Sequence, residues 1–389
     1  MEPAATAHAT PISLLTGFLG SGKTTVLNYL LRQPDLGQTA VVINEFGAIG
    51  LDHELVESST ENMVLLQSGC LCCTIRGDLL QTLHQLLDRR NKGEVTPFDR
   101  VIIETTGLAD PAPILHTLMT DGLLSQEFRL DGVITTVDAT SGSSTLDKQV
   151  EAVKQAAVAD RLLLTKTDLA DPGTVHALEA RLREINPGAP IIRVHNGVVD
   201  PTRLLDAGLY NPATKSLDVQ NWLKAEAYSE PGHHHAGHHH HNHDHHDHHH
   251  DGHGHHDHHH DPNRHDDRIS AVSYTIDDPI PVKTFDEWLE TMIMLRGPDI
   301  LRLKGIVHVE DMPAPFVLHG VQHIFHTPIL LRDWPSEDRR SRIVLIGRDL
   351  SDEFLKQSFD FLGSRTDRET GDGHEEHHEH SQERDEISA

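Results

Sequence analysis

The chain has 389 residues, 37% of them hydrophobic, and a formal net charge of -27 with histidine neutral. This acidic balance argues against nucleic acid or an anionic membrane as partner and suits a protein that handles cations. Its three cysteines, Cys70, Cys72 and Cys73, lie in one tetrapeptide, which excludes a disulfide framework and indicates a reducing compartment.

Apolar runs alternate with amphipathic runs over residues 11–225. Strands are predicted over 11–16, 39–43, 62–67, 100–103, 132–137, 160–164 and 190–194, and helices over 23–32, 78–89 (with Asp78 as N-cap) and 174–185. Continuous apolar strands alternating with helices predict an α/β fold with a mainly parallel sheet flanked by helices. Polar motifs follow several of these strands, as expected for a ligand site at their C-terminal ends.

The rest of the chain divides by composition. Residues 1–10 are expected to be a flexible N-terminus, 226–268 a disordered His/Asp-rich linker, 269–363 a smaller α+β domain, and 364–389 a disordered acidic and His-containing tail. In the smaller domain, strand patterns cover 271–276, 301–309, 315–318, 320–331 and 342–346, and helix patterns cover 284–294 and 352–362. No leader pattern and no run of roughly 20 apolar residues is found, so we expect a cytosolic protein without a membrane span.

The segment from Gly17 to Thr24 fits G-x-x-x-x-G-K-[ST] at every fixed position. Its glycines allow backbone N–H groups to surround phosphate oxygens, Lys23 would reach the β- and γ-phosphates, and the Thr24 hydroxyl would bind Mg²⁺. The phosphate-binding residues expected here are Gly17, Gly20, Ser21, Gly22, Lys23, Thr24 and Thr25. The alternative is a glycine-rich turn that binds nothing.

Two further motifs complete a candidate nucleotide site. The sequence Thr165-Lys166-Thr167-Asp168 is similar to the [NT]-K-x-D guanine signature, because a carboxylate at Asp168 can accept from two guanine donors that adenine lacks. The alternative is a surface turn. Glu104, after an apolar run, would reach the Mg²⁺ water shell or position the attacking water, and the Gly107 amide would sense the γ-phosphate.

Cys70, Cys72 and Cys73 form a C-x-C-C motif, and thiolates favour Zn²⁺ or Cu⁺. Three thiols in four residues cannot easily all bind one tetrahedral ion, so we expect two or three thiolates and an outside ligand, for which Glu45 is the candidate. Buried structural thiols and a redox pair are the alternatives.

Twenty histidines lie between His233 and His265, interleaved with Asp and Gly. Neutral imidazoles bind Zn²⁺, Ni²⁺, Co²⁺ and Cu²⁺, so the run suits loading of several ions. A purification tag and a pH-responsive spacer are the alternatives. For His308, His323 and His326, ordinary sheet histidines are the favoured interpretation of each.

Taken in order, these motifs resemble the CobW-like metallochaperone GTPases, relatives of the HypB and UreG nickel-insertion GTPases. The resemblance rests on the P-loop, the Asn44-Glu45-Phe46-Gly47 and Gly69-to-Cys73 segments, the 104–111 segment, and Thr165-to-Asp168. The second domain is similar to the CobW C-terminal domain, through Leu303-Lys304-Gly305 and the 346–350 segment.

The resemblance implies GTP hydrolysis coupled to metal transfer, with GTP, Mg²⁺ and Zn²⁺ as the bound species and Co²⁺ or Ni²⁺ as alternatives. Lys23, Glu104 and Glu45 are the expected catalytic residues. Cys70, Cys72, Cys73 and Glu45 would bind the transferred metal, which goes to a metal-requiring client protein. A homodimer is left open. The rival functions are a cobalt or nickel insertion chaperone, a His-rich zinc storage protein, and a small-molecule kinase.

Overall fold

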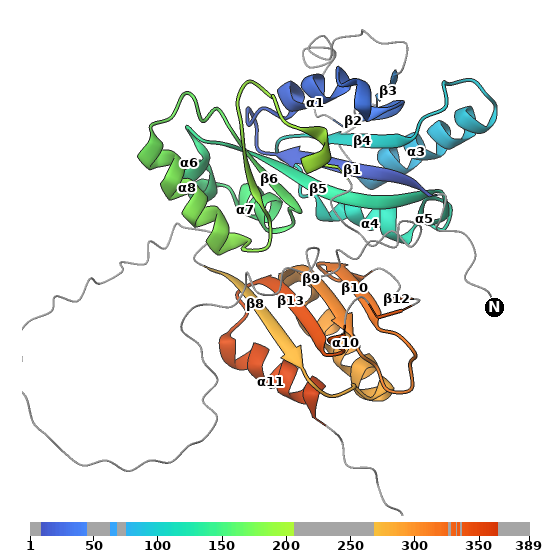
Figure 1. Cartoon of the computed structure of the whole chain (residues 1–389), viewed down its shortest axis with the longest axis vertical. Coiled ribbons are helices and arrows are strands. Elements are labelled where there is room, and N and C mark those ends of the chain that lie inside the picture. The colour runs from blue at the N-terminus through green and yellow to red at the C-terminus, as the bar shows by residue number, and fades with distance from the viewer. Residues whose placement is uncertain are drawn as a thin grey trace, which may run out of the picture.

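The computed structural model describes residues 9–44, 63–67, 75–205, 268–325, 328–331, 333–334 and 337–364. These residues form two β-sheets with their flanking helices. Glu45, the three cysteines, the histidine-rich run and His326 lie outside these residues. Figure 1 shows one sheet in the N-terminal half and the other in the C-terminal half, each with its own helices.

The N-terminal sheet has seven strands in the order β3-β2-β4-β1-β5-β6-β7. They are β1 (Thr10–Gly17), β2 (Thr39–Asn44), β3 (Met63–Gln67), β4 (Arg100–Thr105), β5 (Phe128–Asp138), β6 (Arg161–Thr165) and β7 (Ile191–Val194). Every neighbouring pair is parallel. This confirms the predicted α/β fold, and it brings the C-terminal ends of all seven strands to one edge.

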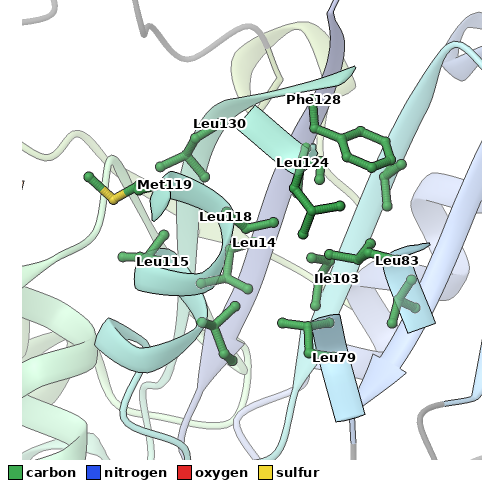
Figure 2. Close-up of a cluster of buried hydrophobic side chains, with 14 of the residues drawn as sticks. Leu14, Leu79, Leu83, Ile103, Leu115, Leu118, Met119, Leu124, Phe128 and Leu130 are labelled. Carbon is green, nitrogen blue, oxygen red and sulfur yellow. The ribbon is translucent and has the colours of Figure 1, made fainter. Parts of the chain in front are cut away.

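Helices cover both faces of this sheet. They are α1 (Lys23–Leu31), α3 (Ile75–Asn91), α4 (Ala112–Thr120), α5 (Leu124–Glu127), α6 (Gly142–Lys148), α7 (Val150–Ala157) and α8 (Pro172–Ile185). Successive strand residues point to opposite faces, so Leu14 packs with α3, α4 and α5 while Leu15 packs with α1. Figure 2 shows the first of these clusters, where Leu79 and Leu83 of α3 meet Ile103 and Leu14 of the sheet.

The helix starting near residue 78 was predicted too short. α3 begins at Ile75, so the prediction of Asp78 as its N-cap is wrong. The apolar face of α3 at Leu79, Leu83 and Leu86 is fully buried, and this packing outweighs the unfavourable propensity of Gly77 in the first turn. Helices α4, α6 and α7 were not predicted.

The C-terminal sheet is antiparallel, in the order β11-β10-β9-β13-β8, with β12 paired to β10. Its strands are β8 (Ile269–Ile276), β9 (Ile300–Val307), β10 (Phe316–Val321), β11 (Ile324–Phe325), β12 (Ile329–Leu330) and β13 (Ser341–Arg348). Helices α10 (Val282–Arg296) and α11 (Asp352–Gly363) pack on one face around Trp288 and Phe359. The strand predicted over 320–331 is interrupted by a turn at Gln322, whose φ is 57°.

The other face of the C-terminal sheet packs against the N-terminal unit. Leu301 and Ile346 join the apolar cluster of α7 and α8, and Val321 and Ile324 join the cluster of α3 and α4. The two units are therefore held together by a shared apolar core. No helix among the described residues is long and apolar enough to cross a membrane.

The centre of this contact is ionic. Asp160, between α7 and β6, lies 2.9 Å from the Lys304 ammonium and forms a further ion pair with Arg302, both on β9. Arg302 also donates to the carbonyl of Val158. Burial would raise the pKa of Asp160, but the charges of Arg302 and Lys304 outweigh it and hold the pKa below its ordinary value. We call these three residues and Val158 the interdomain seam.

Candidate nucleotide site

The candidate site lies at the C-terminal edge of the parallel sheet. The register aligns Leu15 with Glu104, Gly17 with Thr136, and Asp138 with Thr165. The predicted motifs after β1, β4 and β6 therefore meet, although they are far apart in the sequence. Asp138, at the end of β5, belongs to the same edge.

The loop between β1 and α1 has the backbone that its glycines permit. Gly17, Gly20 and Gly22 all have positive φ, at 139°, 71° and 92°. A Cβ at Gly17 would lie 2.2 Å from the Thr136 hydroxyl, so the loop passes too close to β5 for any side chain there. Glycine at this position lets the loop close over the sheet edge and present its N–H groups outward.

Side chains within the loop are held by its own carbonyls and by neighbouring strands. The Lys23 ammonium donates to the carbonyls of Gly17 and Phe18 at 2.9 and 3.2 Å. The Ser21 and Thr136 hydroxyls are 2.6 Å apart, and Thr165 donates to the Ser21 carbonyl at 2.8 Å. The loop is thus preorganised around the position where phosphates bind in P-loop proteins.

Thr24 and Glu104, predicted from separate motifs, lie together. The Thr24 hydroxyl donates to Glu104 Oε1 at 2.7 Å, and Glu104 is only 5% exposed. Hydroxyl and carboxylate oxygens are the hard donors that Mg²⁺ prefers, usually alongside phosphate oxygens and water. These two residues fit a magnesium ion bound with a nucleotide.

Gly107 is in direct contact with the P-loop. A Cβ on Gly107 would lie 2.6 Å from the backbone nitrogen of Leu19, so only glycine allows this approach. The turn containing Gly107 is closed by a hydrogen bond from the Ala109 amide to the Thr106 carbonyl, at 3.2 Å. The backbone amide of Gly107 is thus placed beside the loop predicted to hold phosphates.

Lys166 links the base-recognition segment to the P-loop. Its φ is 55°, and its ammonium donates to the Gly20 carbonyl at 2.7 Å and to Asp138 Oδ2 at 2.6 Å. Burial raises the pKa of Asp138, but hydrogen bonds from Lys166 and Thr140 outweigh it and leave that pKa lowered. The ionised Asp138 therefore fixes the Lys166 stem alongside the P-loop.

Asp168 lies at the open side of the site, with its side chain 41% exposed. His195, after β7, brings its Nδ1 to 3.3 Å from the Thr167 hydroxyl and 4.0 Å from Asp168 Oδ1. Gly197 approaches Thr25 so closely that a Cβ would lie 2.7 Å from the Thr25 carbonyl oxygen. The 195–197 segment therefore forms a wall next to the predicted base-binding residues.

The predicted metal ligands Cys70, Cys72, Cys73 and Glu45 lie outside the described residues. Within the described ranges, no group of three or more His, Cys, Asp or Glu side chains could hold a metal ion. His308 stacks edge-on against Trp334 at 4.8 Å between ring centroids, and His323 lies 6.3 Å from His116.

Sequence reasoning missed three residues near the site. Asp138 directly follows the strand predicted over 132–137 but was given no role, and neither were His195 and Gln155. Gln155 on α7 donates from Nε2 to the carbonyls of Gly107 and Ala109. No local sequence pattern predicts these contacts, because each one joins segments that are distant in the sequence and come together only when the sheet forms.

Comparisons with known proteins agree with both halves of this architecture. A model of the CobW/HypB/UreG nucleotide-binding domain matches residues 11–193, and a model of the cobalamin synthesis protein cobW C-terminal domain matches residues 269–362. The zinc chaperone YjiA of Escherichia coli is 31% identical, over 90% of this chain and 97% of YjiA. The zinc-regulated GTPase metalloprotein activator 1 of Dictyostelium discoideum is 32% identical, over 55% of this chain and 51% of the activator.

A solved structure shows the same arrangement. The crystal structure of the Zn(II)-bound YjiA GTPase from E. coli superposes with a TM-score of 0.64 at 28% identity, covering 91% of this chain and 99% of that one. The similarity thus extends over both sheets.

Proposed function

This chain belongs to the CobW/HypB/UreG family, and from that premise we propose that it is a metallochaperone that couples GTP hydrolysis to the delivery of zinc to a client protein. It is a GTP-hydrolysing enzyme, as its GTPase relatives are. In this proposal Cys70, Cys72 and Cys73, with Glu45, bind the zinc ion, and the histidine-rich run collects metal for them.

The register of three neighbouring strands carries the proposal. Ile43 of β2 pairs with Gln67 of β3 on one side and with Glu104 of β4 on the other. Neighbouring strands are about 4.8 Å apart, so the backbone of Gln67, two strands away, lies about 10 Å from that of Glu104. The segment that leads to the cysteines leaves the sheet at Gln67. Cys70 is three residues beyond Gln67, and Glu45 comes two residues after Ile43. We propose that these short tethers keep the thiols and the carboxylate near the nucleotide site.

This tethering supports a direct coupling between nucleotide and metal. Bound Mg²⁺ would be held by the Thr24 hydroxyl and, through water, by Glu104, and it would neutralise charge on the phosphates. Lys23 would hold the β- and γ-phosphates, and Asp168 would select guanine. When contacts with the γ-phosphate order the segment after β2, Glu45 would approach the thiolates, and hydrolysis would loosen the site and release the zinc ion.

The test is zinc affinity, measured by competition with a chromogenic chelator, in three states: with a non-hydrolysable GTP analogue and Mg²⁺, with GDP and Mg²⁺, and without nucleotide. We expect about tenfold tighter binding with the GTP analogue, a typical coupling between two sites. Equal affinity in all three states would refute the coupling, and a zinc storage protein would give that result.

The matched control is a variant with Cys70→Ser, Cys72→Ser and Cys73→Ser. It keeps all 20 histidines of the linker, so it retains their background binding. We expect it to lose the nucleotide dependence while keeping normal GTP binding. If the nucleotide dependence survives in this variant, the metal site lies elsewhere. Comparing zinc with cobalt and nickel in the same assay identifies the preferred ion.

A further inference from the structure

Gln155 holds the Gly107 turn by two hydrogen bonds. The residue is 1% exposed on α7, and its Nε2 donates to the Ala109 carbonyl at 2.9 Å and to the Gly107 carbonyl at 3.3 Å. A buried primary amide thus spends both of its donors on one short turn. The Leu19 backbone of the P-loop contacts the same turn at Gly107.

The two peptide groups that flank Gly107 are both fixed. Gln155 holds the carbonyl of the 107–108 peptide, and the Ala109 amide holds the Thr106 carbonyl, which belongs to the 106–107 peptide. The N–H of Gly107 is part of that second peptide, so its direction is fixed before any nucleotide arrives. Preorganised donors stabilise developing charge without a reorganisation cost at the moment of reaction.

The support of Gln155 is itself anchored to the sheet. The Thr135 hydroxyl on β5 donates to the Gln155 carbonyl at 2.8 Å. At the end of the helix, Asn186 Nδ2 lies 2.9 to 3.0 Å from the carbonyl oxygens of Ala156, Ala157 and Ala159 and shares its two N–H donors among them. Helix α7 therefore gives the amide a fixed base.

Lys154, the preceding residue, secures the same segment a second time. Its ammonium lies 2.6 Å from Asp110 Oδ2, and Asp110 Oδ1 accepts from the Ala112 amide at the start of α4. This pair is partly exposed, at 22% and 26%, and holds the far end of the segment. Gln155, by contrast, donates to the carbonyl of Gly107 itself.

We propose that Gln155 is a positioning residue for GTP hydrolysis, whose side-chain amide holds the 107–109 turn so that the Gly107 N–H faces the γ-phosphate. The proposal rests on the role given above to Gly107. A merely structural glutamine would stabilise the fold and affect all nucleotides alike. A positioning residue affects only the nucleotide that carries a γ-phosphate.

The experiment compares Gln155→Leu with Thr135→Val. The first removes both amide donors at nearly constant volume. The second removes the anchor to the Gln155 backbone and leaves the amide in place, so it controls for disturbed packing of α7. Affinities for GDP and for a non-hydrolysable GTP analogue are measured with Mg²⁺ and without zinc, together with single-turnover GTP hydrolysis.

For Gln155→Leu we expect about tenfold weaker binding of the GTP analogue, about tenfold slower hydrolysis, and GDP affinity within about twofold of the unaltered chain, from the loss of two buried hydrogen bonds. Thr135→Val should change none of these by more than about twofold, because the Gly107 turn keeps its donors. If Gln155→Leu binds and hydrolyses like the unaltered chain, or if Thr135→Val matches its losses, the proposal is overturned.

Gln155→Glu keeps the test decisive if Gln155→Leu does not fold. It preserves shape but turns an acceptor towards the two carbonyls, so it should show the same selective loss. Measurements on the unaltered chain distinguish the role proposed for Gln155 from the role proposed for Gly107, on which it rests. If that chain binds GDP and the GTP analogue alike, Gly107 does not sense the γ-phosphate; if it distinguishes them and both Gln155 variants do so equally, only the role of Gln155 fails.

Discussion

Strand β6 has a polar cluster at each end, and the two clusters use similar groups in opposite ways. At its C-terminal end, Lys166 pairs with Asp138 beside the P-loop. At its N-terminal end, Asp160 pairs with Arg302 and Lys304 in the interdomain seam. The five residues of β6 span about 17 Å, so one short strand separates them.

The clusters differ in exposure. Lys166 and its partner Asp138 are 37% and 11% exposed and the neighbouring Asp168 is 41% exposed, whereas the Asp160 and Arg302 side chains are 7% and 4% exposed. An exposed charged side chain can leave its protein partner and bind a ligand at little cost in free energy, because water solvates the charge while it is unpaired. Buried charges cannot, because losing one partner leaves the other uncompensated. The first cluster is therefore suited to binding and the second to holding two domains together.

The seam should fail by unfolding. Asp160→Asn leaves Arg302 and Lys304 buried without their counterion, so we expect the free energy of unfolding to fall by about 3–5 kcal/mol. The measurement is urea denaturation. Asp110→Asn is the control: it removes the charge of the partly exposed pair with Lys154, keeps an oxygen to accept from the Ala112 amide, and should cost less than about 1 kcal/mol. Equal costs for the two variants would break the comparison.

The nucleotide end should fail by losing activity. Lys23→Ala removes the ammonium that the P-loop carbonyls hold in place, and we expect GTP turnover to fall by about 10²–10³-fold. The free energy of unfolding should change by about 1 kcal/mol, since the substitution removes hydrogen bonds to loop carbonyls and leaves the apolar core intact. Steady-state phosphate release and urea denaturation on the same samples check both statements. Turnover that survives Lys23→Ala would mean that the P-loop is not the hydrolytic site.

The contrast also explains which parts of the molecule could be predicted. The P-loop, the 104–107 segment and the Thr165-to-Asp168 segment are local, because phosphate and base recognition need fixed residue types at fixed short spacings. The parallel sheet was predictable for a similar reason, since buried strands are continuous apolar runs. Because the strands are parallel, the motifs that follow β1, β4 and β6 were expected to meet at one edge of the sheet.

The seam had no such signature. Arg302 and Lys304 alternate along β9, which in sequence is the pattern of an ordinary strand with a solvated face. Their burial depends on Asp160, 142 positions earlier in the chain. Helix α7, which supplies Gln155, was also missed, although its apolar residues repeat with the helical period over its eight residues. Local sequence patterns do not show which residues distant in the sequence will contact one another.

Base selection gives a smaller effect at the nucleotide end. Asp168→Asn exchanges an acceptor of two guanine donors for a group that can meet only one of them, so GTP affinity should fall by about 5–150-fold, which corresponds to about 1–3 kcal/mol for a bidentate contact. Xanthosine triphosphate, which has a carbonyl where guanine has its amine, should gain affinity. Competition binding with GTP, ATP and xanthosine triphosphate measures the change. If ATP binds the unaltered chain as well as GTP does, Asp168 does not select guanine.

The smallest effect is a pH dependence confined to the seam. Burial, together with the neighbouring Arg302 charge, lowers the pKa of Lys304 to about 7, from 10.5. Above pH 7 the unfolded chain binds a proton at this residue that the native chain has released. The free energy of unfolding should therefore rise with pH, by about 1 kcal/mol between pH 7 and 8 from this group.

Lys304→Met isolates that contribution. The variant has no proton to release, and Arg302 still pairs with Asp160. Asp160 adds no pH dependence between pH 7 and 8. Its pKa is lowered in the native chain and ordinary in the unfolded chain, so it is ionised in both states at these pH values. Urea denaturation of both chains at pH 7 and 8 should give a rise in the unaltered chain that exceeds the rise in Lys304→Met by about 1 kcal/mol. Equal rises would mean that Lys304 keeps its proton in the seam, and that Asp160 holds two cations there throughout.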